Sequence, residues 1–212
     1  MQKINYVFVR NRKLYFFVKR LFDILISLIG LIITLPITIP TILAIKIDDR
    51  GPIFYTQTRV GLNGKCFYIF KFRSMIINAD EKSKELNELN EISGAMFKIK
   101  EDPRVTKVGK FIRKHSIDEL PQLLNVLLGD MSLVGPRPPL PEEVARYSEH
   151  DLQRLIIKPG CTGLWQVSGR NALSFSEMVD LDLDYIQHAG LFLDIKICLK
   201  TVWIMICPNN AY

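Results

Sequence analysis

The longest apolar stretch of the chain lies near the N-terminus. Residues 24–45 read ILISLIGLIITLPITIPTILAI and contain no charged side chain. At about 1.5 Å rise per residue, a straight helix of this length would cross the hydrocarbon core of a bilayer. A signal peptide would have a shorter apolar region followed by a small-residue cleavage site, and neither is evident. The stretch therefore predicts a membrane-inserted helix.

Two prolines leave the path of this helix open. Pro36 removes a backbone donor and crowds the preceding turn, and Pro40 repeats the disturbance one turn later. One interpretation is a helix that spans the bilayer, with its basic end inside and everything after Lys46 outside. The other is a helix broken near Pro36 that enters and leaves the same leaflet. If the rest of the chain uses a cytosolic substrate, both ends of the helix must lie on the cytosolic side.

The remainder predicts a helix-rich α+β domain with a minor β-hairpin. Ile53–Gln57 and Cys66–Phe72 read as its strands, separated by a glycine turn. A capping box at Ser174 and Glu177 predicts a helix that runs to about Gln187. Other helical or amphipathic patterns occur at Asn78–Asn90, Pro103–Lys114, Leu120–Leu128, Glu142–Ile157 and Phe192–Ile206.

Two parts are expected from this pattern. Residues 1–47 form a basic N-terminus with the membrane helix, and residues 48–212 form one integrated domain. Neither an internal repeat nor a low-complexity linker divides the second part. A content of 48% hydrophobic and 24% charged residues excludes a disordered chain.

The charge distribution narrows the class of partner. The net charge is +6, and six bases without an acid fall within residues 1–20, so the rest of the chain is neutral overall. A nucleic-acid-binding protein would spread its basic charge over a docking face, so nucleic acid is not the expected partner. The block instead fits a contact with anionic lipid headgroups beside the membrane helix. The four cysteines form no CxxC pair and have no histidine at metal-ligand spacing, so a zinc site is not expected.

The most informative segment is RKHSIDELP, residues 113–121. Its structural interpretation is a capping box of Ser116 and Glu119, with Asp118 as a first-turn acid favoured by the helix dipole. Pro121 fits that geometry imperfectly because it removes a donor near the fifth helical position, so the helix is expected to start irregularly.

The same segment also has a catalytic interpretation. An ionised carboxylate such as that of Asp118 can act as a nucleophile toward phosphorus. The free N–H groups of a helix N-terminus and a neighbouring base such as Arg113 can hold phosphate oxygens. A divalent ion would then be needed, because an anion would be attacking an anion.

Arginines in two loops are further candidates. Arg137 stands between Pro136 and Pro138, which fix the backbone around a guanidinium that suits bidentate phosphate contact. Arg170 ends a glycine-punctuated turn region. The ordinary interpretation of both is a solvated surface arginine.

Two cations near the hairpin have equally open roles. Lys71 and Arg73 alternate with phenylalanines in the segment KFRSM, so both could lie on one face of a strand. They could bind phosphate there. Alternatively, they belong to a basic patch close to the membrane.

Together these motifs resemble the bacterial sugar transferases, the monotopic phosphoglycosyl transferases of cell-surface polysaccharide and glycoprotein assembly. The resemblance runs in order from about Lys19 to Ile206, and no departure breaks the catalytic pattern. The motifs are the Leu-Pro break of the apolar run, GPIF (51–54), KFRSM (71–75), DPRVT (102–106), SIDELPQ (116–122), GDMSLVGPRP (129–138), and KPG (158–160) through GRN (169–171).

The resemblance implies an activity. Such enzymes transfer a sugar-1-phosphate from a UDP-sugar to undecaprenyl phosphate and release UMP, with Mg²⁺, at the cytoplasmic membrane. The family's dyad falls on Asp118 and Glu119. Asp118 would attack the β-phosphate and form a phosphosugar-aspartyl intermediate, and Glu119 would position the metal or accept a proton.

The resemblance also implies binding roles and a membrane mode. Arg113 matches the family's phosphate-binding arginine, Arg170 a second nucleotide-phosphate contact, and the loop Pro136–Pro138 the nucleotide pocket. Re-entry at Pro36, with the catalytic domain facing the cytoplasm, is the family's membrane mode. Longer relatives carry an additional multi-helix membrane module, so this chain is expected to be a minimal catalytic form. A homodimer and downstream glycosyltransferases are further expected partners.

Two other functional classes remain. A non-catalytic membrane scaffold is disfavoured by the intact Asp118 and Glu119. A nucleotide-sugar phosphohydrolase would discharge the intermediate to water, and the membrane segment would then have no obvious purpose. Neither the sugar nor the glycan pathway follows from the sequence.

Overall fold

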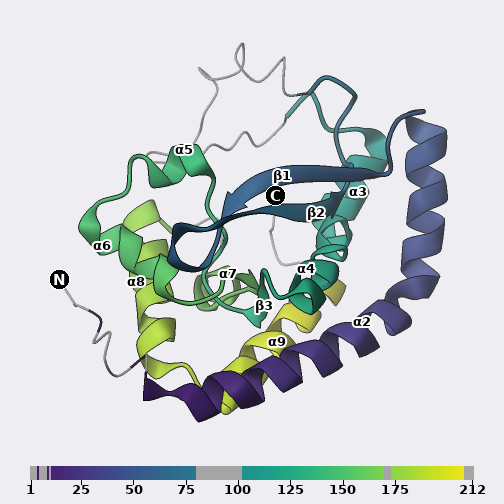
Figure 1. Ribbon diagram of the computed structural model, residues 1–212. Coiled ribbons are helices and arrows are strands. Elements are labelled where there is room, and N and C mark those ends of the chain that lie inside the picture. Colours follow the sequence, from purple (N-terminus) through teal and green to yellow (C-terminus); the bar gives the residue numbers. More distant parts are fainter. Residues whose placement is uncertain (1–3, 5–8, 10, 80–101, 170–172, 208–212) are drawn as a thin grey trace.

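The fold is taken from a computed structural model of the chain, shown in Figure 1. The structure describes residues 4, 9, 11–79, 102–169 and 173–207. Most of the predicted helix at residues 78–90 lies outside these ranges. In chain order the described elements, with η for a short 3₁₀ helix, are α2 (Lys13–Asp48), β1 (Phe54–Val60), η1 (Leu62–Gly64), β2 (Cys66–Phe72), α3 (Lys107–Lys114), η3 (Ile117–Glu119), α4 (Gln122–Leu128), β3 (Ser132–Val134), α5 (Pro141–Val144), α6 (Glu149–Leu152), η4 (Gln153–Ile156), β4 (Gly160–Thr162), α7 (Leu164–Ser168), α8 (Phe175–His188) and α9 (Leu191–Ile206).

The long helix α2 has the opposite polarity pattern to a helix of a soluble protein. Lys19, Asp23 and Ser27 are among its few buried residues, at a spacing of four that gives them one face. Among the described residues, α2 is the one helix long and apolar enough to cross a membrane. Its large exposed side chains are apolar: Leu14, Phe17, Leu21, Ile24, Leu25, Ile26, Leu28, Ile29, Ile32, Ile33, Leu35, Ile37, Ile39, Leu43 and Ile47. An exposed apolar surface of this extent is typical of contact with lipid.

Helix α2 contains both prolines and bends around the domain. Figure 1 shows it running along one side of the domain and then turning to follow a second side. Pro36 and Pro40 lie inside it, and a proline in a helix interior is the usual cause of such a bend. The hydroxyl of Thr34 donates to the Gly30 carbonyl at 2.7 Å, and Thr41 donates to Ile37 at 2.7 Å. The two threonine hydroxyls beside the bend therefore form their hydrogen bonds within the helix.

The first arm of α2 is fixed by a buried polar cluster. Asp194 of α9 is fully buried, and Lys19 donates to its Oδ2 at 3.1 Å. Tyr15 donates to the same oxygen at 2.8 Å, and Tyr185 donates to Oδ1 at 2.6 Å. Asp23 accepts a hydrogen bond from the backbone N–H of Leu133 at 3.1 Å. Because these buried charges are paired and hydrogen-bonded, the arm packs through polar groups without leaving an isolated charge.

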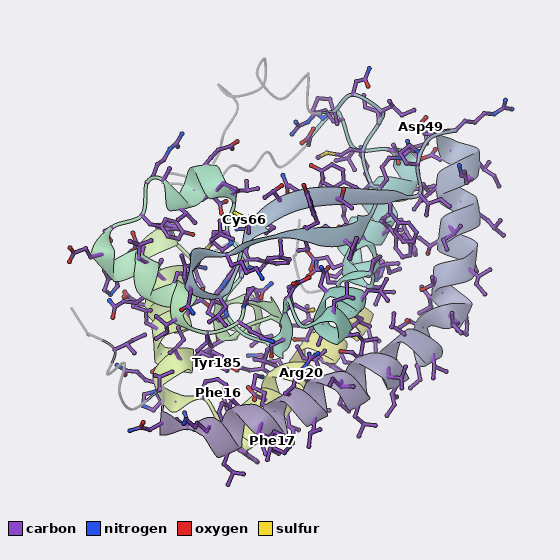
Figure 2. The ribbon with its side chains drawn as sticks, in the orientation of Figure 1. Phe16, Phe17, Arg20, Asp49, Cys66 and Tyr185 are labelled. Atoms are coloured by element: carbon purple, nitrogen blue, oxygen red, sulfur yellow. The ribbon has the colours of Figure 1, made fainter. Side chains whose placement is uncertain are left out.

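Arg20 gives the first arm a further internal partner. Its guanidinium donates to the backbone carbonyls of Val126 and Leu127 at 2.5 and 2.9 Å, at the C-terminus of α4. Figure 2 shows Arg20 pointing toward the domain and Phe17 away from it. Of the N-terminal bases expected to contact lipid headgroups, Arg20 and Lys19 therefore have partners inside the protein instead.

The second arm of α2 packs on the same domain through apolar contacts. Ile45 belongs to a small core cluster with Phe72, Ile112 and Ile117. Asp48, the last residue of the helix, accepts a hydrogen bond from the N–H of Val108 at 3.2 Å. Both arms thus contact one domain.

The predicted hairpin is confirmed. Strands β1 and β2 pair antiparallel, with Tyr55 opposite Lys71 and Arg59 opposite Phe67. Strand β1 extends three residues beyond the prediction, to Val60. The buried amide of Asn125 in α4 accepts from the N–H of Phe70 at 2.9 Å and donates to the carbonyl of Tyr68 at 2.7 Å, so it joins α4 to the hairpin.

A short parallel pair, β3 and β4, lies next to the hairpin and was not predicted. Ser132 pairs with Gly160, and Val134 pairs with Thr162. A Cβ atom on Gly160 would lie 2.1 Å from the backbone nitrogen of Gly135. The two backbones can approach this closely only because glycine has no side chain.

Other helix predictions have mixed outcomes. The helix predicted from Ser174 is confirmed as α8, with Ser174 and Glu177 forming a reciprocal capping box, and α9 confirms the last apolar segment. The single helix predicted for Glu142–Ile157 is wrong, because Ser148 and Asp151 form a second capping box that starts a new helix. The overall prediction is nevertheless confirmed: the structure is helix-rich, with a hairpin and one long apolar N-terminal helix.

Candidate active site

The segment that carries the two adjacent carboxylates is a short 3₁₀ turn. Ser116 has left-handed backbone dihedrals (φ 54°, ψ 22°), and η3 follows over Ile117–Glu119. The predicted capping box is wrong, because the Ser116 side chain forms no cap. The N–H of Glu119 instead bonds the Ser116 backbone carbonyl at 3.2 Å. The expected irregular start is confirmed, since α4 begins only after Pro121. A left-handed serine costs free energy, and such residues cluster at functional sites.

Asp118 is a buried carboxylate with a shifted pKa. Its side chain is only 8% exposed. Burial raises its pKa to about 6; Lys71 opposes this increase, and the charge of Glu119 adds to it. Among the described residues, no other side chain donates a hydrogen bond to its carboxylate. At neutral pH most molecules therefore carry an ionised Asp118 that is not committed to another side chain.

Glu119 has the opposite electrostatic environment. Burial favours its neutral form, but Lys71 lies 2.6 Å from its Oε1 and holds the pKa of Glu119 below its ordinary value. Lys71 reaches it from strand β2. Two neighbouring carboxylates with pKa values pushed apart are a common arrangement in sites that use them in different roles.

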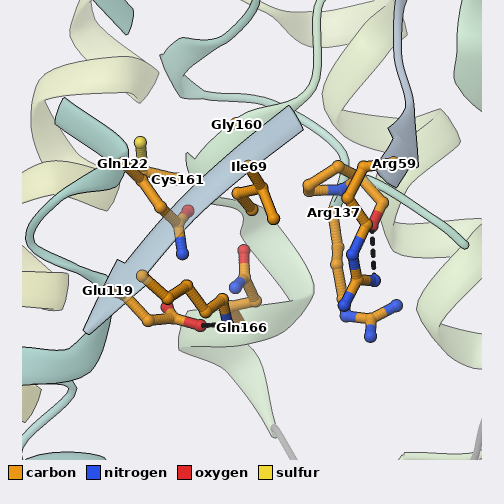
Figure 3. A pocket seen from close by; sticks show the side chains of 10 residues that line it. Arg59, Ile69, Glu119, Gln122, Arg137, Gly160, Cys161 and Gln166 are labelled. Atoms are coloured by element: carbon orange, nitrogen blue, oxygen red, sulfur yellow. Dashed lines mark hydrogen bonds and ion pairs between the residues drawn. The ribbon is translucent and has the colours of Figure 1, made fainter. Parts of the chain in front are cut away.

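Glu119 and Lys71 lie at one end of an open pocket, shown in Figure 3. Arg59 and Arg137 lie side by side at the other end. The pocket is open to solvent and has a cavity volume of about 50 Å³, below the range for sites that enclose a drug-sized ligand. Its lining consists of Arg59, Ile69, Lys71, Glu119, Gln122, Arg137, Pro138, Gly160, Cys161 and Gln166. Three cations and one carboxylate around a pocket suit an anionic ligand.

The chain matches known proteins over nearly its whole length. The profile of the bacterial sugar transferase family matches residues 14–208. The chain belongs to this family. Galactosyl transferase CpsE of Streptococcus agalactiae serotype III (strain NEM316) is 48% identical to it over 194 residues, and undecaprenyl-phosphate galactose phosphotransferase of Salmonella typhimurium (strain LT2) is 48% identical over 201 residues.

The share of each relative that is covered differs. The two alignments cover 91% and 92% of this chain but 43% and 42% of the relatives, so the chain spans about two fifths of their length. The exopolysaccharide production protein ExoY of Rhizobium meliloti (strain 1021) is 40% identical over 198 residues, which are 92% of this chain and 88% of ExoY.

The predicted site residues fall into two groups. The fold brings four of them together in the pocket lining: Lys71, Glu119, Arg137 and Pro138. Asp118 and Arg113 lie outside the lining. Asp118 is next to Glu119 in the chain, and the charge of Arg113, at the end of α3, lowers the pKa of Asp118.

The remaining predicted residues lie elsewhere. Arg73 is buried against Asp49 at the end of α2, with its Nη1 3.5 Å from Oδ2. The carbonyl of Pro136 accepts a hydrogen bond from the N–H of Gly160 at 2.9 Å, which fixes the loop to β4. Pro36 lies inside helix α2. Arg170 is outside the described residues.

Arg59 was missed by the sequence analysis. Tyr55, Gln57 and Arg59 alternate along β1, and the register places them on the hairpin face that carries Lys71. The predicted strand ended at Gln57, so the strand alternation did not reach Arg59, and no motif in that segment marked it.

The dyad has the donor chemistry for a magnesium ion. Magnesium is commonly held by one or two carboxylates together with water and substrate phosphates. Asp118 and Glu119 provide two adjacent carboxylates. Among the described residues, there is no cluster of three or more side chains that could ligate a metal. The residues present thus fit a magnesium site that the substrate phosphates would complete.

Proposed function

We propose that the chain transfers a sugar-1-phosphate from a UDP-sugar to undecaprenyl phosphate and releases UMP. The observation that carries this proposal is the buried carboxylate of Asp118, next in the chain to Glu119, which lines one end of a cationic pocket. The Salmonella relative is an undecaprenyl-phosphate galactose phosphotransferase. That relative is much longer than this chain, so the activity stays a proposal.

The first half-reaction uses Asp118 as the nucleophile. A carboxylate oxygen of Asp118 bonds to the β-phosphorus, and the bond from that phosphorus to the bridging oxygen breaks. The electron pair leaves with UMP, whose phosphate gains one negative charge. The sugar phosphate stays on Asp118 as an acyl phosphate.

Glu119 and Lys71 prepare the site for this step. Lys71 holds Glu119 ionised and places a positive charge next to the attacking carboxylate. A magnesium ion bound at the dyad would neutralise phosphate charge. The positive charges of the pocket act in the same direction, because they stabilise a group whose negative charge grows during the reaction.

The second half-reaction returns the enzyme to its starting state. A phosphate oxygen of undecaprenyl phosphate attacks the phosphorus held on Asp118, and the electron pair of the breaking bond returns to the carboxylate. The product is an undecaprenyl diphosphate sugar. Storing the sugar phosphate on Asp118 means that the soluble and the lipid substrate need not be bound together.

We place the reaction at the cytoplasmic face of the membrane, with α2 entering and leaving one leaflet. Two contacts support this placement. Asp23 on the first arm bonds Leu133, while Ile45 on the second arm packs on Ile112 and Ile117 of the same domain. A straight spanning helix would put its two ends on opposite sides of the bilayer.

The proposal is tested by transfer from labelled nucleotide sugars. Membranes containing the full chain are incubated with Mg²⁺, undecaprenyl phosphate and a panel of UDP-sugars labelled in the sugar, beginning with UDP-galactose. We expect UMP release with label in the organic phase. Label recovered as free sugar phosphate would support a hydrolase instead, and no turnover with any sugar would support a scaffold. Asp118→Asn is the matched inactive control.

A further inference from the structure

The two arginines at the far end of the pocket have an unusual charge balance. Arg59 is 8% exposed, and none of the ion pairs among the described residues includes it. Its guanidinium donates to two neutral acceptors, the carbonyl of Pro138 at 3.0 Å and the side chain of Gln57 at 2.7 Å. A buried charge that meets only neutral partners is costly unless a counter-ion arrives.

Arg137 increases this cost. Burial, followed by the nearby charge of Arg137, lowers the pKa of Arg59 to about 10. Arg137 itself has a carboxylate partner, since its Nη1 lies 3.2 Å from Oε2 of the buried Glu143. The charges of Glu143 and Glu119 oppose this shift, but among the described residues neither forms an ion pair with Arg59. The arginine pair therefore has one ion-paired carboxylate within the described residues and keeps a net positive charge.

The two guanidiniums are held as a unit. Arg59 bonds the carbonyl of Pro138, the residue that follows Arg137, and the N–H of Val60 bonds the carbonyl of Pro139 at 2.9 Å. Strand β1 and the arginine loop are thus fixed to each other before any ligand binds. Preorganised guanidiniums lose little conformational entropy when they bind an anion.

We infer that Arg59 and Arg137 together bind the phosphate that leaves with the nucleotide, whereas the Lys71 end of the pocket takes the phosphate that is transferred. This assignment rests on the proposed function. Figure 3 shows the two ends separated across the pocket, with Glu119 at one and the arginine pair at the other. The leaving phosphate gains a full negative charge as the bridging bond breaks, so the net positive charge lies where charge develops.

The first test measures binding without turnover. The full chain in lipid discs is titrated with UMP, with uridine and with inorganic pyrophosphate. Arg59→Gln should weaken UMP binding about ten- to hundredfold, the effect of losing charged hydrogen bonds, and leave uridine binding within about twofold. Arg59→Lys should recover only part of the loss, because an ammonium lacks the planar fork of a guanidinium. Arg146→Gln removes one charge from an exposed position outside the pocket and should change neither.

The second test separates the two half-reactions. The labelled phosphosugar form of the protein is prepared and divided between UMP and undecaprenyl phosphate. In Arg59→Gln, reversal by UMP should slow about tenfold or more, while discharge to the lipid phosphate should stay within about threefold. Arg137→Gln should show the same selectivity, and it guards against a folding defect in the Arg59 variant because Arg137 is the more exposed side chain.

The outcomes distinguish this inference from the proposed function. An Arg59→Gln variant that binds UMP as well as the wild type, or loses UMP and uridine equally, overturns the inference. A wild-type protein that transfers no sugar phosphate but binds pyrophosphate in an Arg59-dependent way rejects the proposed function and keeps an anion site. Equal slowing of both half-reactions would assign Arg59 a structural role instead.

Discussion

Asp118 and Glu119 are neighbours in the sequence, yet their surroundings push their pKa values in opposite directions. Asp118 is buried with no side-chain donor among the described residues, whereas Glu119 has Lys71 at 2.6 Å. The difference gives the two residues separable tasks: one is an uncommitted nucleophile, and the other is fixed as an anion. Residue-level variants should therefore affect activity and stability in different ways.

Replacement of Asp118 by Asn should abolish turnover and increase stability. Transfer should fall by roughly a thousandfold or more if Asp118 is the nucleophile. The folded protein holds the Asp118 proton more tightly than the unfolded chain does, so the stability that this proton provides is lost as the pH rises from about 4 to about 6. In EDTA at pH 7, Asp118→Asn should raise the free energy of unfolding by up to about 3 kcal/mol. Denaturant titrations should show this gain disappearing by about pH 4, where the wild-type carboxyl is protonated too. An active Asp118→Asn protein would remove Asp118 as the nucleophile.

Loss of Lys71 should release Glu119 from its depressed pKa. In Lys71→Met the carboxyl of Glu119 loses its main opposite charge, so its pKa should rise, and the acid limb of the pH–rate profile should move to higher pH. Lys71→Arg keeps the charge and is the matched control. A profile that does not move in Lys71→Met would show that Glu119 does not need Lys71 to stay ionised.

At the scale of elements, polar side chains and glycines decide how the short pieces join. Asn125 ties α4 to the hairpin, and the cluster around Asp194 ties α2 to α8 and α9. Gly160 and Gly135 let β3 and β4 meet. The joint between β3 and β4 borders the pocket, since Gly160 lines it. Disturbing a joint should therefore damage the site even where no pocket side chain changes.

The buried pair of Lys19 and Asp194 should behave as one unit. Lys19→Met leaves a fully buried carboxylate without its cation and should cost about 3–5 kcal/mol. The double variant Lys19→Met with Asp194→Asn should be considerably less destabilised than the single one, because no unpaired charge remains. Thermal unfolding in lipid discs measures both. Additive losses would show that the two groups are not coupled.

Gly160→Ala should fail through a backbone clash. The new Cβ atom would lie 2.1 Å from the Gly135 nitrogen, so β3 and β4 would have to separate and move the arginine loop. We expect the free energy of unfolding to fall by about 1–3 kcal/mol or more, as in other overpacking substitutions. Gly190→Ala is the control, since its new Cβ would come only within 3.8 Å of a neighbouring oxygen. Equal stability of the two variants would contradict this account.

The local sequence pattern predicts some elements correctly and misses others. The hairpin, α8 and α9 follow from alternation, a capping box and an apolar run, each contained in one segment. The pair of β3 and β4 joins three-residue strands far apart in the chain, and nothing in either segment specifies its partner. The same limit applies to the site. Asp118, Glu119, Lys71 and Arg137 stood out by motif, but Arg59 gains its meaning only from the spatial proximity of Arg137.

At the scale of the whole molecule, the proposed membrane placement depends on α2. Its exposed face is apolar along both arms, and the arms contact one domain on two sides. The bend at Pro36 and Pro40 allows both contacts at once. The path of this helix therefore sets which side of the membrane the pocket faces.

Removing the bend should change the topology of the chain. Pro36→Leu together with Pro40→Leu restores two backbone donors and favours a straight helix. Single cysteines replace Lys13 and Lys65 in the otherwise wild-type chain, and cells are treated with a membrane-impermeant thiol reagent. We expect both cysteines to be labelled in opened cells and neither in intact cells. In the double proline variant, one of the two sites should become labelled in intact cells. Wild-type sites labelled from opposite sides would rule out re-entry.

The inward polar face of α2 has a practical consequence for anyone who wishes to work with a soluble version of the protein. An ordinary anchor can be cut off or exchanged for another hydrophobic helix, because the domain does not depend on its sequence. Here Lys19 and Asp23 complete the interior, and Asp194 and the N–H of Leu133 would lose their partners with them. A truncated or anchor-swapped chain is expected to misfold, so solubility has to come from the surrounding lipid or detergent.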